Sequence, residues 1–264
     1  MRKITIIGGD NRLRVLKERL LEEGFFVDSI ALFENDRGSI KDSDVLILPI
    51  PTTKDKKTVF APLVKREIFL TEIEEQIGDN TLVLSCNYTF SRGKNIDIGS
   101  LDSYSLLNSV PTAEGALKIA IENTDFTLWK SKVLVIGFGR VGKILADRLK
   151  AFGAFVTVSA RKAADFALLD ALGFDYINTS SLNLKKQNYD IIFNTIDAKV
   201  IEDKNIENLN CELVIDLSTF GAFSLDKASE KGIRVLKAPA LPNKTAPKTA
   251  AEILSDTVLN ILNS

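Results

Sequence analysis

The segment that most constrains the fold is a glycine-rich loop between a strand pattern and a helix pattern. Residues 132–136 form a short apolar run typical of a buried strand, and the loop Gly137-Phe-Gly139-Arg140-Val141-Gly142 follows at once. Apolar residues then recur at helical spacing through Leu149, and Gly153 ends the helix. Strand, loop and helix in this order predict the first βα unit of a dinucleotide-binding domain.

Each glycine of the loop has an expected task. Gly137 makes the tight turn, Gly139 lets a pyrophosphate approach the backbone, and Gly142 lets the helix pack closely on the strand. Arg140 and Val141 lie in the first turn of the helix, where free N–H groups and the positive end of the helix dipole favour an anion. We therefore expect residues 137 and 139–142 to bind the cofactor.

The end of the next strand distinguishes between the two nicotinamide dinucleotides. An NAD-binding domain usually presents Asp or Glu there to the ribose hydroxyls, whereas this chain offers Ser159, Arg161 and Lys162. A hydroxyl and two cations favour the 2′-phosphate of NADP. NADP is thus the expected cofactor and NAD the alternative; the competing interpretation is that both cations are solvated surface residues.

Polar residues also follow the later strands. Asn194 and Thr195 end the third strand, and Asp216 and Ser218 end the fourth, at the sheet edge where ligands bind in such domains. We expect them near the nicotinamide ribose and ring, although capping of local turns is an equal alternative. Pro239 and Leu241, in the turn after the last strand, are expected to contact the cofactor at the same edge.

The whole chain repeats the pattern of helix, glycine and strand, as at Gly24, Gly153, Gly173 and Gly232. This predicts an α/β protein with two Rossmann-like, doubly wound parallel-sheet domains joined by a partition helix. The expected parts are a Rossmann- or flavodoxin-like substrate domain (1–110), the partition helix and linker (111–130), the dinucleotide-binding domain (131–240) and a C-terminal loop and helix (241–264). That last helix is expected to pack back on the first domain or the partition helix.

Composition excludes several classes of function. The chain has no histidine, so a histidine base or histidine metal ligands play no part, and the two separated cysteines, Cys86 and Cys211, indicate packing rather than a metal site. Its net charge of −1 gives no basic field for nucleic acid, and no apolar run of membrane-spanning length occurs. We expect a cytoplasmic protein without a bound metal.

Three further segments carry a resemblance to a known family. They are Gly8-Gly9-Asp10-Asn11-Arg12, Asn108-Ser109-Val110-Pro111-Thr112-Ala113-Glu114-Gly115, and residues 238–250. With the glycine loop they make the chain resemble the family of dipicolinate synthase A subunits. The resemblance implies NADP- or NAD-dependent oxidation of dihydrodipicolinate, formed from hydroxy-tetrahydrodipicolinate, to dipicolinic acid. It also implies the mother cell of a sporulating bacterium and, as partner, a flavoprotein-like B subunit, and it leaves homo-oligomerisation open.

The site residues that follow from this resemblance and from their positions are mostly cations and hydroxyls. For the substrate carboxylates we expect Arg12, Thr52, Thr53, Lys54 and, at the start of the partition helix, Asn108, Ser109 and Thr112. Lys244 and Glu114 are the catalytic candidates, and Lys248 is a second lysine in the same turn as Lys244. Helix capping by Thr112 and Glu114, and solvated surface positions for Arg12 and Lys54, are the alternatives.

Two other functions remain open from the sequence. One is an NADP-dependent dehydrogenase of the shikimate or alanine dehydrogenase layout, with Lys54 and Asp55 as acid and base. Adjacent residues on a strand point to opposite faces, which weakens that pair. The other is a cofactor-binding accessory subunit whose partner performs the chemistry.

Overall fold

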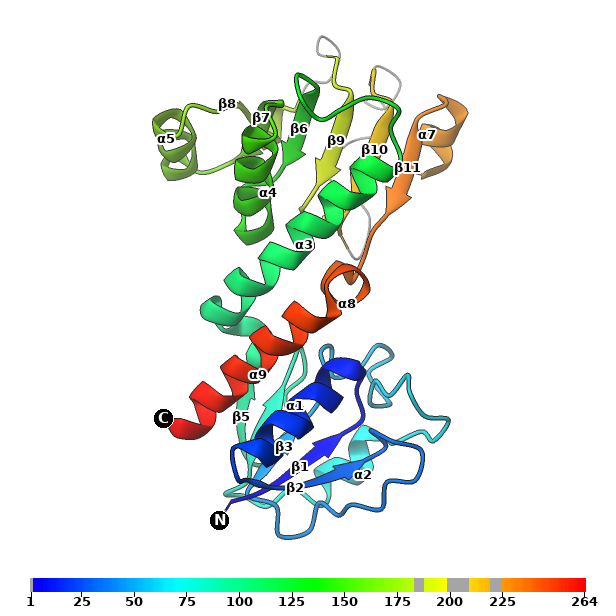
Figure 1. The fold of residues 1–264 in the computed structure, drawn as a ribbon, viewed down its shortest axis with the longest axis vertical. Coiled ribbons are helices and arrows are strands. Elements are labelled where there is room, and N and C mark those ends of the chain that lie inside the picture. The colour runs from blue at the N-terminus through cyan, green and yellow to red at the C-terminus, as the bar shows by residue number, and fades with distance from the viewer. Residues whose placement is uncertain (1, 183–187, 199–208, 219–224) are drawn as a thin grey trace. The chain divides into compact units, whose positions relative to one another are not determined.

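The structure, a computed structural model, describes residues 2–182, 188–198, 209–218 and 225–264 (Figure 1). The chain forms two compact units, and each unit has its own parallel sheet. The first unit contains residues 1–108 and 247–264, and the second contains residues 109–246. Within the described ranges, no helix has the length and apolar character needed to cross a membrane.

The first unit is built on a five-stranded sheet in the order β2-β1-β3-β4-β5, in which all neighbours are parallel. Its strands are β1 (Lys3–Ile7), β2 (Phe26–Ile30), β3 (Val45–Ile47), β4 (Leu82–Ser85) and β5 (Lys94–Asp97). The strand order reverses between β1 and β3, so this pair marks the switch point of the sheet. In sheets of this kind a ligand crevice lies at the carboxyl ends of the switch-point strands.

Helices cover both faces of the first sheet. One face packs against α1 (Asn11–Glu22) and α9 (Pro247–Asn263), whose leucines and valines interdigitate with Ile4, Ile6 and Ile47. The other face packs against the short helix α2 (Leu70–Glu74). The 3-10 turn η1 (Ile98–Ser100) follows β5. The predicted return of the C-terminal helix to the first domain is confirmed by its packing on α1.

The second unit has a six-stranded parallel sheet in the order β11-β10-β9-β6-β7-β8. Its strands are β6 (Lys132–Ile136), β7 (Phe155–Ala160), β8 (Asp175–Asn178), β9 (Ile191–Asn194), β10 (Leu213–Asp216) and β11 (Arg234–Lys237). Numbered along the chain, this is the 3-2-1-4-5-6 order of a dinucleotide-binding Rossmann domain. The switch point lies between β6 and β9.

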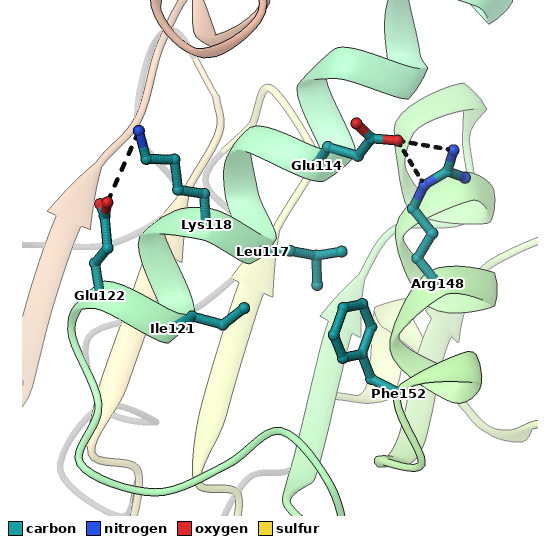
Figure 2. Close-up of a pocket in the computed structure, with 7 residues that line it drawn as sticks. All are labelled: Glu114, Leu117, Lys118, Ile121, Glu122, Arg148 and Phe152. Atoms are coloured by element: carbon teal, nitrogen blue, oxygen red, sulfur yellow. Dashed lines mark hydrogen bonds and ion pairs between the residues drawn. The ribbon is translucent and has the colours of Figure 1, made fainter.

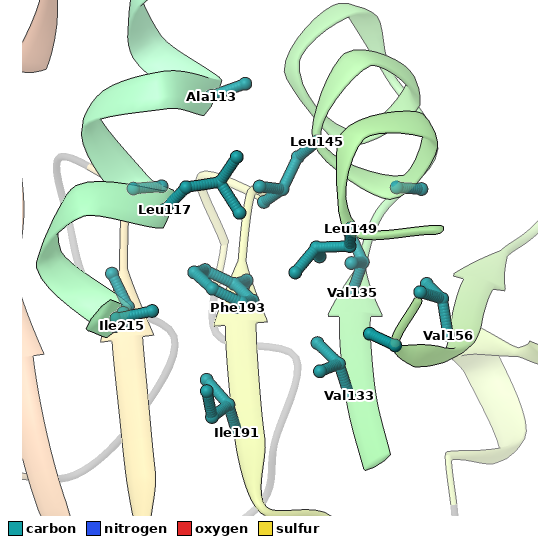
Figure 3. Packing of buried hydrophobic residues seen from close by; sticks show 14 of the residues in the cluster. Ala113, Leu117, Val133, Val135, Leu145, Leu149, Val156, Ile191, Phe193 and Ile215 are labelled. Atoms are coloured by element: carbon teal, nitrogen blue, oxygen red, sulfur yellow. The ribbon is translucent and has the colours of Figure 1, made fainter. Parts of the chain in front are cut away.

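The core of the second unit follows from the alternation of side chains along its strands. Val133 and Val135 of β6 point to one face, together with Phe193 of β9, and pack under α3 (Asp102–Glu122) and α4 (Arg140–Ala151) (Figure 3). Leu134 and Ile136 point to the other face, where α7 (Leu225–Glu230) lies. Both faces are therefore apolar, as buried parallel strands require.

The remaining elements of the second unit are short. They are α5 (Ala163–Ala171), the 3-10 turn η2 (Thr179–Ser181) and α8 (Leu241–Thr245). Gly115 of α3 lies against α8, where an added Cβ would be 2.7 Å from the Thr245 hydroxyl oxygen. The predicted fold class, two doubly wound parallel α/β domains, is confirmed by both sheets and by their helices.

The partition helix differs from the prediction at its start. The sequence predicts that it begins at Pro111, at the start of a helical stretch that separates two series of strands. Instead α3 begins at Asp102 and contains Pro111 in its interior, and the boundary between the two units falls within the helix, after Asn108. The buried residues Tyr104, Ser109, Ala113 and Ala116 anchor it on both sides of the proline. Burial thus outweighs the backbone hydrogen bond that proline removes.

Candidate functional site

The glycine loop lies at the switch point of the second sheet. Gly137 follows β6 directly, and Thr195 follows β9 on the neighbouring strand. The loop leads into α4, whose N-cap is Gly139. The fold therefore brings the predicted cofactor loop to the sheet edge where Rossmann domains bind dinucleotides.

Two of the three glycines are required by the protein itself. Gly137 has a φ of 103°, and a Cβ there would lie 2.6 Å from the Thr195 hydroxyl oxygen. A Cβ on Gly142 would lie 2.2 Å from the carbonyl oxygen of Gly137. The close approach of α4 to the end of β6 thus leaves no room for a side chain at either position.

We expect Gly142→Ala to destabilise the second unit by about 1–3 kcal/mol, because α4 must move away from the Gly137 carbonyl to admit the methyl group. Urea denaturation measures the loss. Gly139→Ala is a control for adding a methyl group alone, because Gly139 has a φ of −79° and, outside its chain neighbours and its own helix, no heavy atom of the described residues lies within 4 Å of the added Cβ. Equal stability of wild type and Gly142→Ala would contradict the close contact between α4 and the Gly137 carbonyl.

Gly139 is different. Its φ of −79° suits any residue, and no heavy atom of the described residues would lie within 4 Å of a Cβ built there, outside its chain neighbours and its own helix. Neither the backbone nor the packing requires glycine at this position. The first turn of α4 begins beside it, and the first N–H groups of a helix have no partner within the helix. The space beside Gly139 suits a phosphate held by those groups.

The residues at the end of β7 differ in their exposure to solvent. Ser159 is fully buried: its hydroxyl oxygen accepts a hydrogen bond from the Gly137 N–H (3.2 Å) and lies 2.9 Å from the Thr179 hydroxyl oxygen. Arg161 and Lys162 are exposed just beyond the strand. Among the described residues, neither cation has an ion-pair partner. Ser159 therefore supports the loop from below, and the two cations remain available to an anion.

The polar residues after β9 and β10 form one buried network. The Asn194 amide donates to the Asp216 carboxylate (2.8 Å), which also accepts hydrogen bonds from the Ser218 backbone N–H (3.1 Å) and hydroxyl (2.7 Å). Asn194 and Asp216 are at most 1% exposed. Thr195 donates to the Ile136 carbonyl (2.9 Å), which ties β9 to β6. The predicted contacts of these four residues with a nicotinamide stay predictions.

The turn after β11 contains both exposed and buried residues. Pro239 is exposed, whereas Leu241 is 3% exposed and packs in the core beside Gly115. Lys244 is exposed on α8. Lys248, in the first turn of α9, lies 4.0 Å from the carboxylate of Glu252. The cofactor contacts predicted for Pro239 and Leu241, and the catalytic role of Lys244, are not tested by this geometry.

In the first unit, Arg12 is buried rather than solvated at the surface. Its Nε donates to both carboxylate oxygens of Asp10 (3.0 and 3.2 Å), and its Nη2 donates to Asp10 (2.8 Å) and to the Ile50 carbonyl (2.6 Å). Asp10 also caps the N-terminus of α1. Burial lowers the pKa of Arg12, but the hydrogen bond and charge of Asp10 outweigh it and raise that pKa above its usual value. Arg12 is therefore a fixed positive charge.

The segment after β3 holds itself in place. The fully buried Thr52 hydroxyl donates to the Pro49 carbonyl (3.2 Å) and accepts from the Cys86 N–H (2.8 Å). Thr53 donates to Asp55 (3.0 Å), and the Lys54 ammonium lies 4.0 Å from the centre of the Phe60 ring. Hydrogen bonds from the Thr58 and Lys57 backbone and from hydroxyls lower the pKa of the Asp55 carboxyl. Asp55 therefore stabilises its own loop, which speaks against the alternative Lys54–Asp55 acid and base pair.

The expectation that Asn108, Ser109, Thr112 and Glu114 begin a helix is wrong. They lie in the interior of α3, so they neither cap it nor share the free N–H groups of its first turn. Asn108 and Thr112 are half-buried, and Ser109 is buried. Their predicted substrate contacts are untested.

Glu114 lies on the outer face of α3. Its carboxylate accepts from the Arg148 guanidinium of α4 (3.2 and 3.3 Å) at the rim of a groove of about 520 Å³ (Figure 2). Leu117, Ile121 and Phe152 form the apolar part of this groove, and none of the loop glycines lines it. The structure thus places Glu114 in an ion pair between two helices, apart from the cofactor loop.

Sequence reasoning did not single out Tyr104 as a site residue. Its side chain is 3% exposed, and among the described residues its hydroxyl has no hydrogen-bond partner. Burial raises the pKa of Tyr104 to about 12 and that of the Cys86 thiol to about 11. The available signal was a tyrosine within an apolar helical stretch, which is equally typical of a core residue.

Comparison with known proteins shows what this chain is similar to. Residues 3–89 match the family model of the N-terminal domain of the dipicolinate synthase A subunit. The chain is also 28% identical to the dipicolinate synthase A subunit of Bacillus subtilis (strain 168), an alignment that covers 98% of this chain and 95% of the relative. The chain is therefore similar, over nearly its whole length, to a dipicolinate synthase A subunit. The resemblance seen in the glycine turns and the proline-rich segment is thereby confirmed.

Solved structures support the same relationship. The crystal structure of the dipicolinate synthase A subunit from Bacillus halodurans matches with a TM-score of 0.89 and 29% identity, over 100% of this chain and 98% of that one. The apo-structure of D-lactate dehydrogenase from Escherichia coli matches with a TM-score of 0.65 and 13% identity, over 99% and 96% of the two chains. The second similarity concerns the fold alone, which dehydrogenases share with the dipicolinate synthase subunits.

Proposed function

We propose that this chain is the NADP-dependent A subunit of a dipicolinate synthase. It oxidises dihydrodipicolinate, which forms from hydroxy-tetrahydrodipicolinate by loss of water, to dipicolinic acid. Two hydrogens leave the ring, one as a hydride to the nicotinamide and one as a proton, so one NADP is reduced for each product. The observation that carries the proposal is the open space beside Gly139 at a Rossmann switch point, in a chain similar to this synthase subunit.

The chain's own residues divide the binding of the cofactor among them. The N–H groups of the first turn of α4 hold the diphosphate beside Gly139, where a side chain would intrude. Arg161 and Lys162 pair with the 2′-phosphate, and buried Ser159 keeps Gly137 in position. The network of Asn194, Asp216 and Ser218 fixes the ends of β9 and β10, which would contact the nicotinamide half of a bound cofactor.

In this oxidation the main task of the protein is to orient the substrate ring and the nicotinamide. When bound, the nicotinamide accepts the hydride, and formation of an aromatic pyridine supplies driving force. The chain must hold two carboxylates and accept one proton. We assign proton acceptance to Lys244, which follows the last strand and would act as a neutral amine, because an ammonium group accepts no proton. Glu114 is the second candidate and would have to leave its ion pair with Arg148. We assign substrate binding to Arg12 and to the hydroxyl groups of Thr53, Ser109 and Thr112.

The subunit name of the relatives implies a partner. We propose that a B subunit, flavoprotein-like by the same resemblance, completes the enzyme, and that the pair acts in the mother-cell cytoplasm of a sporulating bacterium. Because we assign the dinucleotide site to this chain, the role left to the B subunit is either to supply the substrate or to assist the release of the product.

Product formation tests the proposal. The purified chain is incubated with NADP and freshly formed dihydrodipicolinate, with and without a B subunit, and pyridine absorbance is followed. We expect dipicolinate in both mixtures and faster formation with the B subunit. Product only in the presence of B would favour an accessory role for this chain, and no product in either mixture would refute the synthase assignment.

Arg161→Ala tests the choice of NADP. We expect its affinity for NADP to fall about tenfold, because a hydrogen bond to a charged group is lost, while its affinity for NAD stays unchanged. Calorimetric titration with both dinucleotides measures the ratio. Arg148→Ala, which removes a guanidinium paired with Glu114, is the matched control. Equal losses for NADP and NAD would exclude a 2′-phosphate contact.

A further inference from the structure

A buried tyrosine hydroxyl in the first unit has no hydrogen-bond partner among the residues that the structure describes. Tyr104 lies in the first turn of α3 and packs in the core cluster beside α1 and α9. It is 3% exposed, and within the described ranges nothing accepts or donates a hydrogen bond at its hydroxyl. Buried polar groups almost always have a partner, and an unpaired one destabilises the fold. The Tyr104 hydroxyl, unpaired within the described residues, is therefore the kind of group that a bound ligand would satisfy.

Arg12, in the same unit, presents a second unused donor. Its Nε and Nη2 are taken by Asp10 and the Ile50 carbonyl, whereas its Nη1 has no partner among the residues described. Tyr104 belongs to the core cluster that contains Leu13, the chain neighbour of Arg12, and Ile50, whose carbonyl accepts from Arg12, packs against that cluster. The charges of Arg12 and Asp10 also act on the Tyr104 hydroxyl. Because Tyr104 keeps its proton and Arg12 its charge, the unused groups are donors.

The position of this cluster in the fold is that of a ligand site. Gly8 to Arg12 follow β1 and Ile50 follows β3, the two strands between which the order of the first sheet reverses. A crevice at the carboxyl ends of such strands is the common place for a ligand. Arg12 also lies in the first turn of α1, a helix of 12 residues whose N-terminus favours negative charge.

We propose that the Nη1 of Arg12 and the hydroxyl of Tyr104 form a carboxylate-binding site in the first unit. Donors without an acceptor suit an anionic oxygen, and the planar guanidinium matches a carboxylate. The site holds one carboxylate of the heterocyclic dicarboxylate, and to that extent it rests on the proposed function. Asp10 positions Arg12 for this contact, and the fixed positive charge of Arg12, which has no acceptor atom, makes the site selective for an anion over an ammonium group.

Tyr104→Phe tests the site without disturbing the fold, because it removes only an atom that has no partner among the described residues. The full-length chain is titrated calorimetrically with pyridine-2,6-dicarboxylate, in wild-type and variant forms. We expect the variant to bind the dicarboxylate about tenfold more weakly, with unchanged NADP affinity and equal or higher resistance to urea. Tyr176→Phe, which removes an exposed tyrosine hydroxyl in the second unit, is the control.

The outcomes separate the site from the proposed function. Binding of the dicarboxylate that depends on Tyr104 supports the site even when dihydrodipicolinate is not oxidised, in which case only the function fails. Equal affinity of wild type and Tyr104→Phe overturns the site, even when the wild type oxidises dihydrodipicolinate. Failure of the wild type to bind the dicarboxylate, with or without NADP, also overturns it.

Discussion

Replacing Gly139 with aspartate is expected to abolish NADP binding while leaving the fold intact. Aspartate is a preferred N-cap residue, and its charge is favourable at the start of α4, so the helix keeps or gains stability. In the proposed function, the same side chain would fill the space that we assign to the diphosphate and would repel it. We expect the affinity for NADP to fall more than about 100-fold, measured by calorimetric titration, with an unchanged urea midpoint.

Gly139→Asn is the matched control, because it has the same shape as aspartate and no charge. It should retain the cap and weaken NADP binding less than aspartate does, so the difference between the two variants measures the electrostatic part. NADP binding by Gly139→Asp at wild-type affinity would mean that the diphosphate does not lie beside the start of α4. Loss of folding would mean instead that glycine is needed there by the protein.

Removing the buried guanidinium of Arg12 should give the largest loss of stability. The Arg12 and Asp10 side chains are 10% and 8% exposed, so Arg12→Met leaves a carboxylate buried without its partner. We expect the free energy of unfolding to fall by about 3–5 kcal/mol, as for other broken buried ion pairs. Urea denaturation followed by circular dichroism measures it.

A double variant separates the charge from the packing. Asp10→Asn combined with Arg12→Met removes both charges but retains an N-cap residue for α1, so it should recover most of the lost stability. A loss of less than about 1 kcal/mol in Arg12→Met, the size expected for an exposed pair, would show that Arg12 is solvated. Little recovery in the double variant would attribute the effect to packing of the arginine stem.

The sequence predicts the second unit best, because its signals are local. A strand, three spaced glycines and a helix fix β6, the loop and α4 within a short stretch, and Gly153 ends the helix as expected, with a φ of 81°. Leu13, Leu16 and Leu20 likewise predict the buried face of α1. Such patterns need no knowledge of the rest of the chain.

Features that depend on tertiary packing could not be predicted from the sequence. The edge strand β5 has the polar sequence Lys-Asn-Ile-Asp and a half-exposed surface, so it lacks the apolar run by which its neighbours are recognised. The helix α3 continues through Pro111 because its flanking residues are buried. Ser159 was expected to face a phosphate, but its burial beneath Gly137 depends on how β6 and β7 pair.

The candidate substrate residues show the same limit. Whether Arg12 is solvated or buried depends on Asp10 and on Ile50, which lies 38 positions away. Tyr104 gains its significance only from the missing partner of its hydroxyl among the described residues, which no sequence pattern reports. Glu114 was chosen for its place in a family segment, but its helical face directs it toward Arg148.

In the proposed function, this chain holds the dinucleotide that oxidises the ring. The decisive experiment uses dihydrodipicolinate deuterated at the ring carbons that lose hydrogen, with NADP and the purified chain, and mass spectrometry of both products. We expect one deuterium in each reduced dinucleotide for each dipicolinate formed, and none with Gly139→Asp. Dipicolinate that forms while all the deuterium passes to water would rule out hydride transfer to a dinucleotide on this chain.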